Sequence, residues 1–121
     1  FGSAPDVLRF AAEMLAAERG RSALFSAEVA REFFRRQEIA PGSDWALGWD
    51  TPTEGQSTSG TLFSKRSIGH TGFTGTSLWI DLERGMTVVL LANRIHLVAK
   101  RSRFELRPHV HDLIWEAFLA A

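Results

Sequence analysis

The chain has 121 residues, of which 45% are hydrophobic and 23% charged, with 14 basic and 14 acidic side chains and no cysteine. This composition excludes a disordered or membrane-spanning profile, and a compact domain of this size buries roughly two-thirds of its unfolded surface. The absence of cysteine excludes disulfides without fixing the compartment. The zero formal net charge gives no reason to expect a nucleic-acid partner.

The N-terminal part of the chain has the periodicity of two helices. Ser3 and Asp6 form a start that resembles a capping box, and Gly20 provides a stop, so we expect a helix from Ser3 to Arg19. Ser26 is expected to cap a second, shorter helix. Apolar side chains recur on one face of each helix. They are Val7, Phe10, Ala11, Met14 and Leu15 in the first helix and Val29, Phe33 and Phe34 in the second.

The middle of the chain alternates between strand and loop patterns. Residues 45–49, Trp-Ala-Leu-Gly-Trp, are expected to form a strand. Residues 51–60 are rich in Thr, Ser, Gly and Glu and predict an exposed loop. A further strand is expected over residues 67–70.

A hairpin follows. Residues 77–82 are rich in strand formers, residues 83–85 predict a short turn, and residues 86–92 are apolar apart from Thr87. A continuous apolar strand is normally buried on both faces, so we expect each side of the sheet to be covered.

The chain ends in a predicted helix from Pro108 to Ala121, because proline suits the first turn of a helix. Its expected buried stripe consists of Val110, Leu113, Ile114, Ala117 and Phe118. The order of elements predicts an α+β fold. In it, a three-strand meander plus one further strand is flanked by N-terminal helices and a C-terminal helix.

The most informative segment is 69–76, Gly-His-Thr-Gly-Phe-Thr-Gly-Thr, directly before the hairpin. Glycine lets a backbone approach a ligand closely, and threonine hydroxyls and a neutral imidazole both donate and accept hydrogen bonds. A strand edge with these groups is typical of one wall of a ligand cleft. The alternative is structural: such glycine-threonine stretches also form bulges and turns, and a lone strand histidine is often a surface residue.

Residues 68–94 resemble the third-motif region of class C β-lactamase-like serine hydrolases, which include β-lactamases, penicillin-binding-protein-like peptidases and carboxylesterases. The third motif of that family is Lys-Thr-Gly or a His-Thr-Gly variant, and His70-Thr71-Gly72 matches the variant. The family continues into a hairpin and a strand ending in Leu-x-Asn, which Leu91-Ala92-Asn93 matches, and then a C-terminal helix. The resemblance covers most of the chain and is weakest between residues 20 and 67.

Two other family motifs are missing from these 121 residues. Lys65 and Lys100 are preceded at the Ser-x-x-Lys spacing by Leu62 and Leu97, and the chain has no tyrosine for a Tyr-x-Asn motif. We therefore expect residues 1–121 to be one segment, the C-terminal portion of a serine hydrolase domain, that does not turn over substrate alone. The alternative is a non-catalytic binding or interaction module that kept the fold.

The resemblance implies roles for individual residues. The backbone N–H of Phe73 is expected to hold the developing oxyanion, Thr71 to bind a carboxylate or hydroxyl of the substrate, and Gly72 to let substrate lie along the strand. His70 takes the place of the motif lysine. Asn93 is expected either to bind substrate or only to cap the end of its strand. The histidine variant favours esterase or peptidase chemistry over β-lactam hydrolysis.

The expected partner is a small-molecule or peptide-like substrate of the full-length parent, with no cofactor, no metal, no nucleic acid and no membrane span. His109, His111 and Asp112 hint at a metal, but i and i+2 on a helix point to different sides. The basic run is expected to be a solvated loop; it consists of Arg94, Lys100, Arg101, Arg103 and Arg107. Apolar surface and strand edges left open by the missing part predict a homo-oligomer. The compartment stays open between cytoplasm and periplasm.

Overall fold

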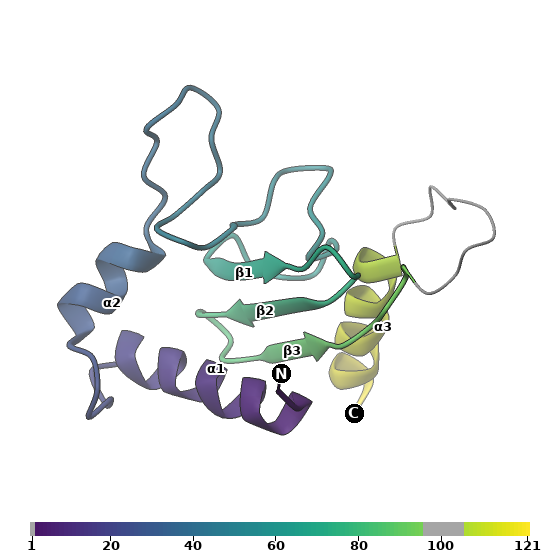
Figure 1. The fold of residues 1–121 in the computed structure, drawn as a ribbon, viewed down its shortest axis with the longest axis horizontal. Coiled ribbons are helices and arrows are strands. Elements are labelled where there is room, and N and C mark those ends of the chain that lie inside the picture. The colour runs from purple at the N-terminus through teal and green to yellow at the C-terminus, as the bar shows by residue number, and fades with distance from the viewer. Residues whose placement is uncertain (1, 96–105) are drawn as a thin grey trace.

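The computed structural model describes residues 2–95 and 106–121. Within these residues it contains three helices and three strands (Figure 1). In chain order they are α1 (Ala4–Glu18), α2 (Ala27–Phe34), β1 (Ser67–Thr71), β2 (Ser77–Asp81), β3 (Thr87–Leu90) and α3 (Leu106–Ala120). None of the helices in this described part is both long and apolar enough to cross a bilayer.

Both N-terminal helices begin at the predicted caps. The Ser3 hydroxyl accepts from the Asp6 N–H and the Asp6 carboxylate accepts from the Ser3 N–H, which completes the capping box at the start of α1. The Ser26 hydroxyl accepts from the Val29 N–H at 3.2 Å and caps α2. Gly20 follows α1 with a φ of +69°, a conformation that glycine adopts without strain.

The three strands form the predicted antiparallel meander, in the order β1-β2-β3. Trp79 of β2 lies opposite Gly69 of β1 on one side and Val88 of β3 on the other. β3 is shorter than the apolar run 86–92, and of its residues only Val88 is buried. The expectation that this strand is buried throughout is wrong, because within the described residues β3 is an edge strand.

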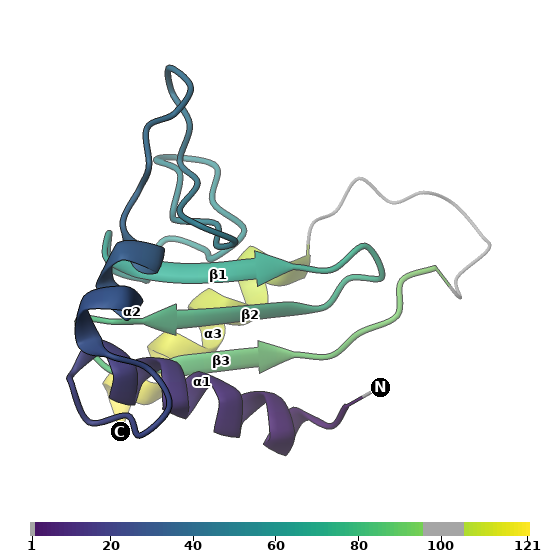
Figure 2. The same ribbon diagram turned by 60° about the vertical axis from the view of Figure 1, so that its left-hand side comes forward.

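The sheet lies between two helical layers, which confirms the α+β class and the cover predicted for each face. Ile68 and Ile80 pack on α1, where they meet Ala11 and Met14. Trp79 and Val88 point to the opposite face, where they pack with Phe63 and with Trp115 of α3. Successive side chains of a strand point to opposite faces, so one short meander serves two cores. Figure 2 shows α1 in front of the sheet and α3 behind it.

The strand predicted over residues 45–49 does not form. Gly48 has a φ of +74°, and the Ala46 N–H donates to the Trp49 carbonyl, so the segment turns back on itself. Pairing with β1 is reduced to one isolated bridge between Asp50 and Gly69. A glycine in the left-handed region interrupts the extended backbone that a ladder needs.

α3 buries a different face from the one predicted. Its buried residues are Arg107, His111 and Trp115, whereas Leu113 and Phe118 are each 63% exposed. The helix also begins two residues before Pro108. The expected apolar stripe is wrong because the polar pair Arg107 and His111 finds hydrogen-bond partners on the sheet side, which makes their burial favourable.

The loop at 51–60 is less exposed than predicted. Thr51 and Ser59 are buried, and the carbonyl of Thr58 accepts a hydrogen bond from Nδ1 of His111 at 2.9 Å. Asp112 extends the attachment by accepting from the Thr61 N–H at 2.7 Å. This loop is therefore fastened to α3, which its composition alone did not indicate.

Candidate functional site

The outer edge of β1 presents backbone groups rather than another long strand. Gly69 exchanges two hydrogen bonds with Asp50, at 2.8 and 2.9 Å. Because alternate residues of an antiparallel strand direct their backbone groups to the same side, those of Thr71 face this edge too. Phe73 lies just past β1 and is 81% exposed. Within the described residues its N–H has no hydrogen-bond acceptor.

His70 is exposed at this edge and is not turned into the core. Its Nδ1 lies 3.0 Å from the carbonyl oxygen of Thr71, which can only accept, so this nitrogen carries the proton and Nε2 is left as the acceptor of the neutral ring. The imidazole meets the indole of Trp45 edge-on, with 5.8 Å between ring centroids. Burial raises the pKa of the Asp50 carboxyl, and the charge of nearby His70 opposes that rise.

The glycines of the motif serve the fold rather than only an approaching ligand. A Cβ on Gly69 would lie 2.3 Å from the Trp79 ring, so this glycine makes room for the largest core side chain. Gly75 has a φ of +106°, which turns the chain into β2. The turn closes through two backbone bonds, from Gly72 N–H to the Thr76 carbonyl at 2.8 Å and from Gly75 N–H to the Gly72 carbonyl at 3.1 Å.

Two arginines from distant parts of the chain hold this turn. Arg94, after β3, donates from its backbone N–H to the Thr74 carbonyl at 2.8 Å and from Nε to the Phe73 carbonyl at 3.1 Å. Arg107 of α3 donates to the carbonyls of Gly72 and Gly75. The solvated-loop prediction is therefore wrong for Arg107, which is 5% exposed. The middle of that basic run, residues 100–103, lies outside the described residues.

Asn93 lies beside the turn at residues 72–76, because the N–H of the next residue, Arg94, donates to the Thr74 carbonyl of that turn. Its side-chain oxygen accepts from the Ile95 N–H at 3.1 Å, a local turn after the strand. This bond is the capping role that the sequence left open. The substrate-binding role of Asn93 stays a prediction.

The histidines of α3 do not gather around a metal position. His111 is buried, and its Nε2 lies 3.1 Å from the Ser77 hydroxyl while Nδ1 donates to Thr58. Asp112 is engaged by the backbone of residues 61 and 62. Among the residues that the structure describes, no three His, Asp or Glu side chains lie close enough together to hold a metal ion.

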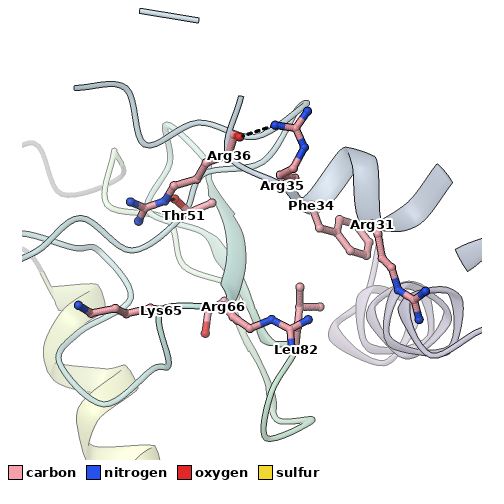
Figure 3. Close-up of a pocket in the computed structure, with 9 residues that line it drawn as sticks. Arg31, Phe34, Arg35, Arg36, Thr51, Lys65, Arg66 and Leu82 are labelled. Carbon is pink, nitrogen blue, oxygen red and sulfur yellow. Dashed lines mark hydrogen bonds between the residues drawn. The ribbon is translucent and has the colours of Figure 1, made fainter. Parts of the chain in front are cut away.

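A basic cavity of about 400 Å³ lies at the other end of β1. Its walls are Arg31, Phe34, Arg35, Arg36, Thr51, Lys65, Arg66, Ser67 and Leu82. In Figure 3 the cationic ends point in different directions, with Arg36 toward Thr51 and Arg31 on the opposite side. Several are engaged by nearby acids, as in the 2.9 Å pair of Arg66 with Glu18. Ser67 is the first residue of β1 and the motif lies at the other end of the strand, and neither His70 nor Phe73 lines this cavity.

Sequence patterns did not indicate three contributors to this region: Arg107, Trp45 and Asp50. Each reaches the motif by tertiary contact, from α3 or from the turn before residue 51. The one local signal for such a contact was Gly48, which lies between Trp45 and Asp50 in sequence. The turn at this glycine brings Asp50 to β1, where it pairs with Gly69.

Comparison with known proteins identifies the architecture around this edge. A model of the family described as Beta-lactamase matches residues 1–110. The chain belongs to the Beta-lactamase family. The match includes the His-Thr-Gly motif, the whole sheet and the first turn of α3.

Curated relatives are similar to a part of this chain. A putative D-alanyl-D-alanine carboxypeptidase of Escherichia coli K12 is 37% identical over 75 residues, which are 60% of this chain and 17% of that protein. A Salmonella newport protein of the same description is 35% identical over 79 residues, 64% of this chain and 18% of the relative. The chain thus matches less than a fifth of the length of these relatives.

A solved structure shares the fold. The crystal structure of a beta-lactamase from Mycobacterium bovis superposes with a TM-score of 0.75 over 97% of this chain and 44% of that one, at 22% identity. At this identity the similarity concerns the fold alone. The layered arrangement of α1, sheet and α3 is therefore a recurring one.

Proposed function

We propose that residues 67–94 form one wall of the active site of a serine hydrolase that cleaves an amide or ester bond through an acyl-enzyme. The observation that carries the proposal is the backbone N–H of Phe73, which lies directly after His-Thr-Gly and has no acceptor within the described residues. An unpaired donor at an open strand edge is available to a substrate. The nucleophile would come from outside these 121 residues.

Each group at this edge has a chemical task in the proposed reaction. A serine attacks the carbonyl carbon, and the carbonyl oxygen becomes an oxyanion that a preorganised N–H donor stabilises. The Phe73 N–H is that donor. Nε2 of His70 accepts a proton or a hydrogen bond from the nucleophile's network, while the bond from Nδ1 to the Thr71 carbonyl fixes the ring. The Thr71 hydroxyl binds a polar group of the substrate.

A peptide-like substrate is the favoured class. The curated relatives are described as putative D-alanyl-D-alanine carboxypeptidases, and an open strand edge suits an extended peptide that adds to the sheet. The indole of Trp45, beside His70 and 49% exposed, adds an apolar surface for a methyl-bearing side chain.

The test uses the complete gene product that contains this chain. We expect a fluorescent penicillin or a fluorophosphonate to label one serine, which mass spectrometry identifies, and a D-alanyl-D-alanine peptide or a short-chain ester to be hydrolysed. His70→Ala is expected to lower kcat/KM by about 10²-fold or more, the usual contribution of a positioned acid or base.

His109→Ala is the matched control, because His109 is an exposed histidine on α3 that does not belong to the His-Thr-Gly motif. It is expected to keep the activity of the unmodified protein. A complete gene product that neither reagent labels, and that leaves peptide, ester and β-lactam intact, would refute the proposal and favour the non-catalytic module.

A further inference from the structure

Arg107 is a buried cation whose contacts converge on the motif turn. It is 5% exposed, and it comes from the first turn of α3, on the far side of the sheet from α1. Nη2 donates to the Gly72 carbonyl at 2.7 Å, and Nε donates to the Gly75 carbonyl at 3.3 Å. One planar guanidinium thus binds two carbonyls of the same turn, which the fixed fork of arginine permits and a lysine ammonium does not.

The first of these carbonyls belongs to the same peptide unit as the Phe73 N–H. A peptide unit is planar and, when trans, directs its C=O and its N–H in opposite directions. No peptide bond of the described chain is cis. Holding the Gly72 oxygen toward Arg107 therefore points the Phe73 N–H away from the guanidinium, and within the described residues no acceptor meets it.

The Gly72 carbonyl also accepts from the Gly75 N–H at 3.1 Å, so Arg107 is the second of two donors that hold this peptide unit. A glycine on one side of a peptide tolerates backbone dihedrals that other residues avoid, so the Gly72–Phe73 unit is easily rotated. The next unit is held by Arg94, whose Nε donates to the Phe73 carbonyl at 3.1 Å. The cation on the Gly72 oxygen also polarises the amide, which strengthens the hydrogen bond that its N–H can donate.

We propose that Arg107 is a positioning residue that fixes and polarises the Gly72–Phe73 peptide, so that the Phe73 N–H is directed at the oxyanion of the reaction. The catalytic part of this inference, that the N–H meets an oxyanion, rests on the proposed function. Its structural content, the orientation of one peptide unit, is testable without turnover.

The kinetic test compares Arg107→Lys with Arg84→Lys in the complete gene product. Arg84 is a matched control because its guanidinium also donates to a carbonyl, that of Leu62 at 2.6 Å, but away from the motif. Arg107→Lys is expected to lower kcat at least about tenfold, toward the 10²–10³-fold loss for removing a whole oxyanion donor, with KM little changed. Equal kcat values for the two variants would overturn the inference and leave the proposed function intact.

A second readout does not depend on activity. In isotope-labelled protein, Arg107→Lys is expected to shift the ¹³C resonance of the Gly72 carbonyl and to alter the ¹H shift and exchange rate of the Phe73 amide, while Arg84→Lys leaves both unchanged. Unaltered Gly72 and Phe73 signals in Arg107→Lys would overturn the inference. If the unmodified protein proves inactive, the proposed function fails and these signals alone decide the orienting role. If Arg107→Lys does not fold, Arg107→Gln, which keeps one donor, is measured in the same way.

Discussion

Gly69 is constrained both by its backbone hydrogen bonds and by the packing of a core side chain against it. Its backbone is bonded to Asp50 on the outer edge, and its missing side chain leaves the space that the Trp79 ring fills. A Cβ there would lie 2.3 Å from the Trp79 ring and 2.7 Å from the Leu78 carbonyl oxygen, and Trp79 is fully buried. The absence of a side chain at Gly69 therefore lets β1 pack closely against the Trp79 ring, and this packing fixes the position of the strand that carries His70.

The Gly69→Ala substitution is predicted to destabilise the protein. Overpacking of a closed core costs about 1–3 kcal/mol, because neighbouring side chains and backbone must shift. The measurement is the free energy of unfolding from urea titration. Gly2→Ala is the control, since a Cβ at Gly2 meets no atom within 4 Å. An alanine at position 69 that unfolds at the same urea concentration as the unmodified protein would contradict this account of the packing.

At the scale of the element, α3 shows how polar contacts select the buried face of a helix. His111 accepts from or donates to Ser77 of β2 and donates to the loop carbonyl of Thr58, so one side chain joins helix, sheet and loop. Asp112, next to it, binds the N–H groups of Thr61 and Leu62. These contacts turn α3 so that its most regular apolar stripe faces outward.

The burial of His111 predicts that stability depends on pH. Desolvation lowers the pKa of His111 below its ordinary value; the Thr58 carbonyl and the charge of Asp112 oppose this, and the charge of Arg107 adds to it. An unfolded histidine titrates near pH 6.5. The folded state therefore binds the proton less readily, and the stabilisation is complete above about pH 6.5 and is lost as the pH falls below it.

Urea titrations between pH 5 and 8 provide the measurement. The free energy of unfolding is expected to decrease below about pH 6.5, by at most about 1.4 kcal/mol per pH unit for one proton. His111→Gln separates this effect from the titration of carboxylates, because its amide has no charge change in this range. The prediction fails if the variant and the unmodified protein show the same pH dependence.

At the scale of the whole molecule, the described residues leave much apolar surface uncovered. Leu113 and Phe118 of α3 are each 63% exposed, and a hollow of about 260 Å³ between α1 and α2 is lined by side chains such as Phe10, Phe33 and Trp49. The sheet has two edges within the described residues, at β1 and β3. Exposed apolar patches and open edges both favour association.

The isolated 121-residue chain is accordingly predicted to self-associate. Multi-angle light scattering over a wide concentration range should give a mass above that of the 13.5 kDa monomer. Replacing Leu113 and Phe118 together by aspartate is expected to reduce the mass, because charges oppose burial of this face. Glu116→Gln, a change at an exposed site on the same helix, serves as control. A monomer at all concentrations would show that these surfaces do not associate.

Local chemistry explains which parts of the fold were predictable. The ends of the N-terminal helices are set by Ser3, Ser26 and Gly20. These residues act through hydrogen bonds and backbone dihedrals that involve only neighbours in sequence. The meander was predictable for a similar reason, since residues 67–90 pair with the strand next along the chain. His70, Thr71 and Phe73 were predicted at the site from a motif of consecutive residues, and the first two of them lie in β1.

The sequence by itself determined the elements, the α+β class and the family, because capping, alternation and a short motif are properties of consecutive residues. Only the tertiary structure decided which face of α3 is buried, that residues 45–49 turn instead of pairing, and that Arg107 reaches the carbonyl of Gly72. The turn at 45–49 follows from the left-handed φ of Gly48, and the other two have one physical reason in common. Burying a polar side chain or a strand edge is favourable only when a partner is in reach, and the partner comes from a distant part of the chain.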